Sequence, residues 1–140
     1  MTYDVSAIVN DGNAEYHRHL RHGTLTMQGC AKCGYVRYPA WPFCPECLSD
    51  EYEWRALPGT GRVETFVWYL KDAYDATYDS GWAWRDVPYN VALVKLDGGP
   101  TLNSNVLESS FEALKPGQVI EPLFVPISDE FAILRFKPTD

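Results

Sequence analysis

All four cysteines of this 140-residue chain lie between residues 30 and 47, and their spacing constrains the fold more than any other feature. Two C-x2-C pairs, Cys30/Cys33 and Cys44/Cys47, are separated by ten residues. Each pair presents two thiolates at a turn, and structural Zn²⁺ prefers a tetrahedron of such ligands. Two turns complete the coordination and leave no open position for a substrate. The spacing therefore predicts a structural metal site formed by Cys30, Cys33, Cys44 and Cys47.

Two disulfides or an iron atom are the alternative uses of the same cysteines. Residues 1–10 have no basic start followed by an apolar run, so no export signal is recognised. We therefore expect a cytoplasmic protein, and disulfides are rare in that compartment. A rubredoxin-type iron site uses the same four thiolates, so the spacing alone does not separate zinc from iron. The closed, structural character of the site favours zinc.

Composition and motifs narrow the classes of function. The net charge is −7, from 12 basic and 19 acidic residues, which argues against nucleic-acid binding because phosphates must be met by Lys and Arg. No stretch approaches about 20 apolar residues, the length that spans a membrane. G-x-S-x-G, P-loop, G-x-G-x-x-G and H-E-x-x-H motifs are absent. With every thiol assigned to the metal, we expect no catalytic residue in this chain.

A short helix is predicted over residues 13–22, after an N-terminal arm. Asn13 suits the N-cap position, Tyr16 and Leu20 share one face, and Gly23 is expected to end the helix. The rest of the surface is expected to carry the only basic cluster of the chain: His17, Arg18, His19, Arg21 and His22. This cluster is interpreted either as a solvated helix face or as a contact for an anionic group or an acidic partner.

The remaining pattern is mostly β. Short strands are predicted at 24–28 and 35–38, beside the first cysteine pair, and a turn cluster at 57–62 marks a module boundary. Longer strands follow at 62–71, 89–96, 101–106, 119–125 and 131–136, with a helical turn at 109–114. Five strands with a helical turn between the third and the fourth are typical of an OB-fold barrel. The first of them carries apolar groups on both faces, so this strand is expected to be long and mostly covered. We expect an arm and helix at 1–23, a metal ribbon at 24–57 and the barrel at 58–140.

Two segments carry more aromatic residues than their modules can bury. One is the stiff segment 39–43 between the cysteine pairs, with Trp41 at its centre; so small a ribbon cannot bury it alone. The other is the loop 72–88, which is too long for a tight hairpin. The loop is interpreted either as local core over the barrel or as a contact with a partner or substrate. Its large aromatic residues are Tyr74, Tyr78, Trp82 and Trp84.

A specific combination of motifs runs through nearly the whole chain, from about residue 15 to residue 138. It comprises Gly23-x-Leu25-x-x-Gln28-x-Cys30-x-x-Cys33-Gly34, Tyr38-Pro39, Cys44-Pro45-x-Cys47, Gly59-x-Gly61-x-Val63, Pro88-Tyr89-x-Val91-Ala92-Leu93-Val94-x-Leu96-x-x-Gly99, Leu114-x-x-Gly117-x-x-Ile120 and Phe136-x-Pro138. This combination resembles the acyl-CoA-associated zinc-ribbon/OB-fold family, long known as a domain of unknown function. Loop 72–87 departs from the shorter loops of that family.

The resemblance implies an N-terminal helix, a rubredoxin-like zinc ribbon with the family's ligands at Cys30, Cys33, Cys44 and Cys47, and a five-stranded OB-fold barrel. It also implies a non-catalytic subunit that forms a hetero-oligomer with a thiolase-like catalytic subunit, supports its activity and helps to line a CoA or acyl site. Alternatives are a subunit of a MaoC-like enoyl-CoA hydratase, a single-stranded nucleic-acid-binding module and a free-standing enzyme. Candidate contacts with the partner or with acyl-CoA are Tyr16, Arg18, Leu20, Arg21, Lys32, Arg37, Trp41, Tyr74, Tyr78, Trp82 and Trp84.

Overall fold

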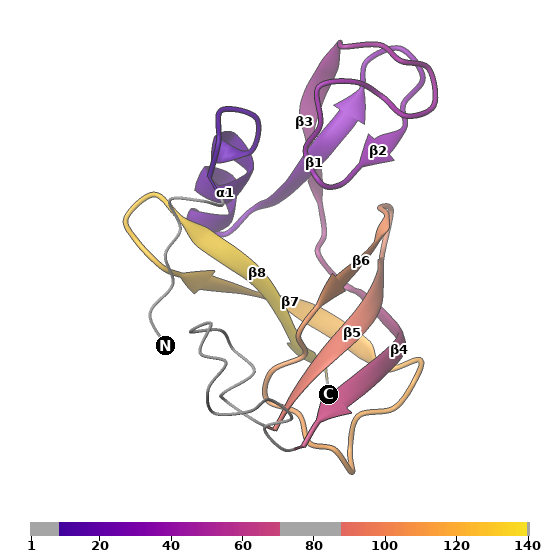
Figure 1. Ribbon diagram of the computed structural model, residues 1–140, viewed down its shortest axis with the longest axis vertical. Helices are drawn as coiled ribbons and strands as arrows, with labels where there is room; N and C mark the ends of the chain where they lie inside the picture. The colour runs from indigo at the N-terminus through magenta and orange to yellow at the C-terminus, as the bar shows by residue number, and fades with distance from the viewer. Residues whose placement is uncertain (1–8, 71–87, 140) are drawn as a thin grey trace, which may run out of the picture.

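The computed structural model describes residues 9–70 and 88–139 (Figure 1). Within these ranges one helix precedes two antiparallel sheets. The helix is α1 (Ala14–Arg21). The smaller sheet has the order β2-β1-β3, from β1 (Leu25–Cys30), β2 (Val36–Arg37) and β3 (Tyr52–Leu57). The larger sheet has the order β6-β5-β4-β7-β8, from β4 (Gly61–Tyr69), β5 (Tyr89–Leu96), β6 (Thr101–Ser104), β7 (Val119–Pro126) and β8 (Ala132–Pro138).

Helix α1 forms where the sequence predicts it, but its N-terminus is held differently from the expectation. Asn13 occupies the N-cap position without capping the helix through its side chain. Its Oδ1 instead accepts a hydrogen bond from the Asn10 N–H at 2.8 Å, and the Asn10 carbonyl accepts from the Ala14 N–H at 2.9 Å. Gly23, with φ +81°, ends the helix in the left-handed region that glycine adopts readily.

The larger sheet curls into a nearly closed barrel. Strand β4 pairs with both β5 and β7, and β6 and β8 approach each other at the remaining seam. There the Ser104 hydroxyl donates to the Leu134 carbonyl at 3.2 Å, and Val106 forms a parallel bridge with Phe136. This path of strands confirms the predicted OB-fold. The segment between β6 and β7 contains a turn in which the Ala113 and Leu114 N–H groups donate to the Ser110 carbonyl.

The expectation that β4 is mostly covered is wrong, because five of its nine residues are exposed. A bulge interrupts the pairing with β5 between Val63 and Thr65. One extra residue exchanges the two faces of a strand, so Phe66 and Trp68, rather than Val67, pack against the core that contains Val63. Val67 is therefore 56% exposed.

Strand β3 was not anticipated from the sequence. It pairs with β1 along its whole length, from Leu57 opposite Leu25 to Tyr52 opposite Cys30. A weak signal was available, because Tyr52, Trp54 and Ala56 alternate with charged residues as in a half-covered strand. The sequence prediction instead placed only a module boundary here, at the turn cluster that follows.

One continuous apolar core joins the three parts of the chain. Leu20 of α1, Leu25 and Met27 of β1, and Val63 and Phe136 of the barrel all belong to it. Helix α1 lies beside both β1 and β8, so it fills the angle between the ribbon and the barrel (Figure 1). The described part of the chain contains no helix long and apolar enough to span a membrane.

Candidate metal centre and its surroundings

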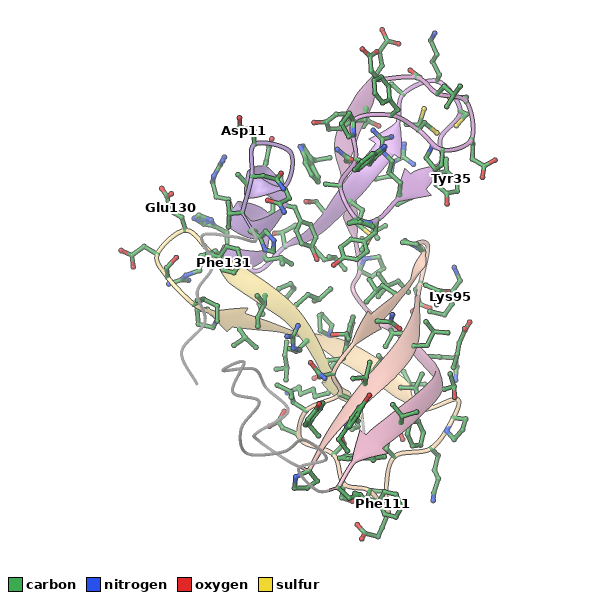
Figure 2. All side chains as sticks on the ribbon, viewed as in Figure 1. Asp11, Tyr35, Lys95, Phe111, Glu130 and Phe131 are labelled. Atoms are coloured by element: carbon green, nitrogen blue, oxygen red, sulfur yellow. The ribbon has the colours of Figure 1, made fainter. Side chains whose placement is uncertain are left out.

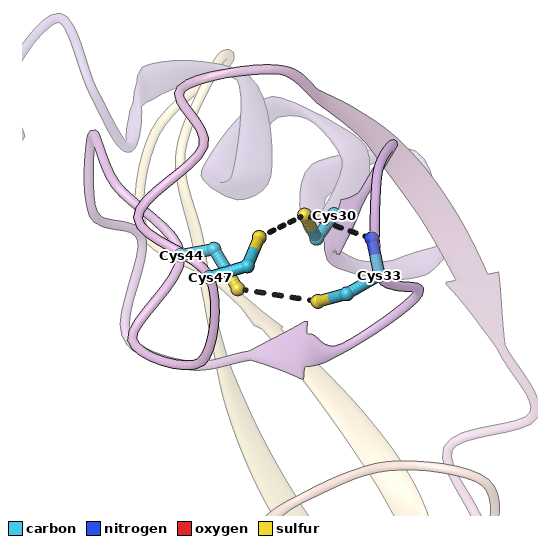
Figure 3. A group of neighbouring side chains, drawn as sticks. All are labelled: Cys30, Cys33, Cys44 and Cys47. Atoms are coloured by element: carbon cyan, nitrogen blue, oxygen red, sulfur yellow. Dashed lines mark hydrogen bonds between the residues drawn. The ribbon is translucent and has the colours of Figure 1, made fainter.

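The four cysteine sulfur atoms lie together at the end of the smaller sheet (Figure 3). All four lie within 4.8 Å of one another, with 3.6 Å between Cys30 and Cys47 and 3.5 Å between Cys33 and Cys44. A disulfide would need about 2.05 Å, so all four are free thiols. Tetrahedral Zn²⁺ with Zn–S bonds of about 2.3 Å places its sulfur atoms about 3.8 Å apart. The observed cluster fits such an ion.

Two loops of the same backbone geometry hold these sulfur atoms. In the first knuckle, residues 30–35, the Cys30 N–H donates to the Tyr35 carbonyl at 2.8 Å and the Gly34 N–H to the Cys30 carbonyl at 3.0 Å. The second knuckle, residues 44–49, repeats both bonds: Cys44 N–H to the Ser49 carbonyl at 2.9 Å and Leu48 N–H to the Cys44 carbonyl at 2.8 Å. The fifth residue is left-handed in both, with φ +80° at Gly34 and +65° at Leu48.

Backbone N–H groups of the knuckles point at the sulfur atoms. The Cys33 N–H lies 3.5 Å from the Cys30 sulfur, and the Glu46 N–H lies 3.4 Å from the Cys44 sulfur. The Cys33 N–H, with smaller contributions from neighbouring donors, lowers the pKa of Cys30 to about 6. At Cys33 the Tyr35 N–H lowers the pKa, but desolvation and the neighbouring thiols outweigh it and raise the pKa to about 12. A divalent cation would supply the positive charge that four adjacent thiolates need.

The burial of the ligands leaves one side of the centre facing solvent. Cys30 and Cys44 are buried, whereas Cys33 and Cys47 are exposed. Four thiolates in a closed shell offer no free coordination position, so the arrangement suits a structural ion. When bound, Zn²⁺ would connect β1 to the loop that follows β2.

The expected basic face of α1 is only partly exposed. The expectation that His17 lies on the surface is wrong: it is buried, its Nδ1 lies 2.9 Å from the Ala132 carbonyl, and its ring stacks on Phe131. Burial lowers the pKa of His17. Arg18 is exposed, and the Arg21 Nε donates to the Ser128 carbonyl at 2.8 Å. His17 and Arg21, from the predicted basic face, therefore bind the helix to the barrel.

Three other candidate contact residues are buried and pack within the chain. Tyr16 and Leu20 belong to the core, so they present no surface to a partner, because the apolar helix face packs inward. Arg37 is 4% exposed and lies inside the ribbon, which makes it unsuitable for binding CoA phosphates. Lys32 is exposed on the first knuckle, and Trp41 is exposed between the knuckles. Tyr74, Tyr78, Trp82 and Trp84 lie outside the described residues.

The ribbon contains a polar network that the sequence reasoning missed. The buried Gln28 Oε1 accepts hydrogen bonds from the Trp41 N–H at 2.8 Å and from the Arg37 Nε at 2.9 Å. The Arg37 Nη2 donates to the Trp41 carbonyl at 2.9 Å. The available sequence signal was the presence of Gln28 and Arg37 in two short strands that are mostly apolar. Such residues at buried strand positions need partners.

Solved structures resemble this chain over both the ribbon and the barrel. The chain of the "Ltp2-ChsH2(DUF35) aldolase" superposes with a TM-score of 0.75 and 25% identity, covering 93% of this chain and 96% of that one. A DUF35 protein of unknown function from Sulfolobus solfataricus superposes with a TM-score of 0.63 at 16% identity, which supports the fold alone.

Curated relatives carry two kinds of name. "DUF35 domain-containing scaffold protein" describes relatives from Methanothermobacter thermautotrophicus, 27% identical over 81% of each chain, and from Pyrococcus furiosus, 29% identical over 77% of this chain and 74% of the relative. A "Probable enoyl-CoA hydratase alpha subunit" from Thermomonospora curvata is 26% identical over 93% of this chain. This chain spans only 38% of that relative's length.

Two family models match consecutive parts of the chain and together cover both modules. Residues 18–53 match the rubredoxin-like zinc ribbon domain of ChsH2, and residues 54–125 match its C-terminal OB-fold domain. The order of the two domains and the clustered cysteines agree with the structure. The chain therefore belongs to the ChsH2 zinc-ribbon/OB-fold family.

Proposed function

We propose that this chain is a non-catalytic subunit of a thiolase-type enzyme complex that forms or cleaves carbon–carbon bonds in CoA thioesters. The observation that carries the proposal is the likeness to the chain of the Ltp2-ChsH2 aldolase over 96% of that chain. A likeness that covers the ribbon, the helix and the barrel together supports a shared role better than a match to one module would. In this proposal a separate catalytic subunit holds the reacting groups.

The state of the potential catalytic groups supports an accessory role. The four thiols belong to one metal cluster. His17 Nδ1 interacts with the Ala132 carbonyl, and His19 Nδ1 lies 2.7 Å from the Thr26 hydroxyl. These contacts join α1 to β8 and to β1, so both rings help to hold the fold together. The name "scaffold protein" carried by several relatives agrees with this interpretation.

A CoA thioester would be bound jointly with the partner in this proposal. Arg18 and Lys32 are the exposed candidate cations, because Arg21 is bonded to the Ser128 carbonyl and Arg37 lies inside the ribbon. The net charge of −7 disfavours long-range attraction of CoA phosphates to this chain, so such contacts would be local.

A second candidate is a subunit of an enoyl-CoA hydratase. The observation that favours it is the relative from Thermomonospora curvata, which is called a hydratase alpha subunit and aligns over 130 residues. Since this chain spans 38% of that relative, the remainder of the relative is free to supply the hydratase chemistry.

Purification of the tagged chain with its partner from the native host tests the proposal. We expect a thiolase-type subunit in stoichiometric amount, with retro-aldol cleavage or thiolysis of a CoA thioester by the complex. The isolated chain should be inactive, and adding it to the isolated partner should raise activity or stability. Recovery of a hydratase-type subunit, with hydration of an enoyl-CoA, would favour the second candidate. A chain that catalyses either reaction alone would contradict both.

A further inference from the structure

Trp41 combines a fixed backbone with an exposed side chain. Its N–H donates to Gln28 and its carbonyl accepts from Arg37, so both backbone polar groups are bonded to buried side chains. The side chain itself is 63% exposed. Two buried polar residues of the ribbon thus hold in place a segment whose largest side chain faces solvent.

Holding this segment through the Arg37 side chain has a free-energy cost, because a charged group is buried. Its guanidinium is buried, packs over the Tyr52 ring at 5.2 Å, and bonds to neutral oxygen atoms of Gln28 and Trp41. Its Nη1 has no hydrogen-bond partner among the described residues. A buried charge without a carboxylate is costly. The fold accepts this cost next to an exposed tryptophan, which indicates that the position of Trp41 matters outside the chain.

The backbone conformation of Leu48 is a second unfavourable feature of this segment. It adopts φ +65°, a conformation disfavoured for side chains with a Cβ, although the equivalent position of the first knuckle is Gly34. Its side chain is 77% exposed, so burial within this chain gives little compensation. Phe43, in the segment that leads into the same knuckle, is 51% exposed. We call Trp41, Phe43 and Leu48 the second-knuckle surface.

The chain segment that carries the second-knuckle surface is acidic. Residues 38–54 contain no lysine or arginine, and Glu46, Asp50 and Glu51 are all exposed there. Zn²⁺ bound by four thiolates adds a net charge of about −2 at the same end of the ribbon. This charge repels nucleic acid and disfavours contact between two copies of the same acidic surface.

We propose that the second-knuckle surface docks into an apolar pocket with a basic rim on the catalytic subunit. Exposed aromatic anchors on a rigid backbone are typical of binding hot spots, and the acidic surroundings require complementary charge on the partner. This proposal rests on the proposed function and names the surface by which the subunit is held. Gln28 and Arg37 act as positioning residues for Trp41.

The test uses the full zinc-loaded chain and, as probe, the catalytic subunit recovered with it. Trp41→Ala and Leu48→Gly are compared with Phe111→Ala, which removes a similarly exposed aromatic side chain (54%) at the far end of the barrel (Figure 2). We expect each second-knuckle variant to weaken binding by about tenfold or more, with the Phe111 variant unchanged. Affinity should fall as salt rises from about 50 to 300 mM, because oppositely charged rims attract.

The melting temperature of each zinc-loaded variant separates docking from structural support. Leu48→Gly should melt no lower than the parent chain while binding more weakly, a combination that a merely structural role does not produce. Weakening that is equal in all three variants, or binding that is unaffected by Trp41→Ala and Leu48→Gly, overturns the proposed surface even if the thiolase-type partner is recovered. A hydratase-type partner that loses affinity for both variants supports the surface while contradicting the proposed function. A salt-sensitive self-dimer that Leu48→Gly dissociates, or a chain that recovers no stoichiometric partner, overturns the proposed occupant.

Discussion

The two knuckles share their backbone bonds and differ in the side chains that they display. Each forms the same pair of backbone hydrogen bonds and supplies two thiolates to one cluster. The first uses Gly34 at the left-handed position and leads directly into β2. The second uses Leu48 and is preceded by a segment whose Trp41 backbone is hydrogen-bonded to Gln28 and Arg37. Metal coordination therefore accounts for the shared geometry, and the asymmetry needs another cause.

The largest effect should follow from removing a ligand, and it should be the same for both knuckles. We expect Cys33→Ser and Cys47→Ser each to lose stoichiometric zinc and to melt at a much lower temperature. The free energy of binding structural zinc, about 10–16 kcal/mol, is also folding free energy in such modules. Metal analysis and thermal unfolding by circular dichroism measure the two quantities. A variant that keeps its metal and its melting temperature would show that the two knuckles are not equivalent.

A smaller loss of stability should follow from removing the support of the second knuckle. Gln28→Ala leaves the Trp41 N–H unpaired and takes one acceptor from the buried Arg37. An unsatisfied buried donor costs about 1–3 kcal/mol, and we expect a total within or slightly above that range. Denaturant unfolding of the zinc-loaded chain measures it. The matched variant Gln118→Ala, whose amide donates to the Val119 carbonyl, should change stability by about 0.5 kcal/mol or less.

The smallest effects should come from the left-handed positions, and they should have opposite signs. Gly34→Ala places a Cβ where nothing lies within 4 Å, so only the backbone conformation opposes it, at about 1 kcal/mol. Leu48→Gly removes that penalty but frees the unfolded chain, so the net gain should be about 0.5–1 kcal/mol. Unfolding of the two variants under identical metal saturation gives the comparison. Destabilisation by Leu48→Gly would mean that the leucine packs usefully within the chain.

Sequence patterns predicted the elements whose signals are local. The cysteine spacing placed the four thiols together, the helical period placed Tyr16 and Leu20 on one face, and turn residues bounded β5 and its hairpin to β6. Each of these depends on residues close together in the chain. The family resemblance added the expectation of a catalytic partner, which local patterns do not contain.

Features that depend on distant contacts were not predicted. His17 resembles its basic neighbours in sequence, and only the packing of α1 against β8 buries it. The bulge in β4 exchanges faces because of its pairing with β5, and the role of Arg37 depends on the return of Trp41 across the ribbon. Buried polar partners far apart in sequence carry no periodic signal.

Strand β3 has a consequence for how such chains can recombine. The two family matches meet between Glu53 and Trp54, inside this strand, and these two residues lie opposite Gly29 and Gln28 of β1. A hybrid joined there would combine one parent's β1 with a partner strand drawn from two parents, next to the Gln28 network. A junction after Leu57, in the turn that ends at Gly61, would keep the paired strands together. The boundary between homologous segments is therefore not the boundary at which a functional ribbon could be exchanged between relatives.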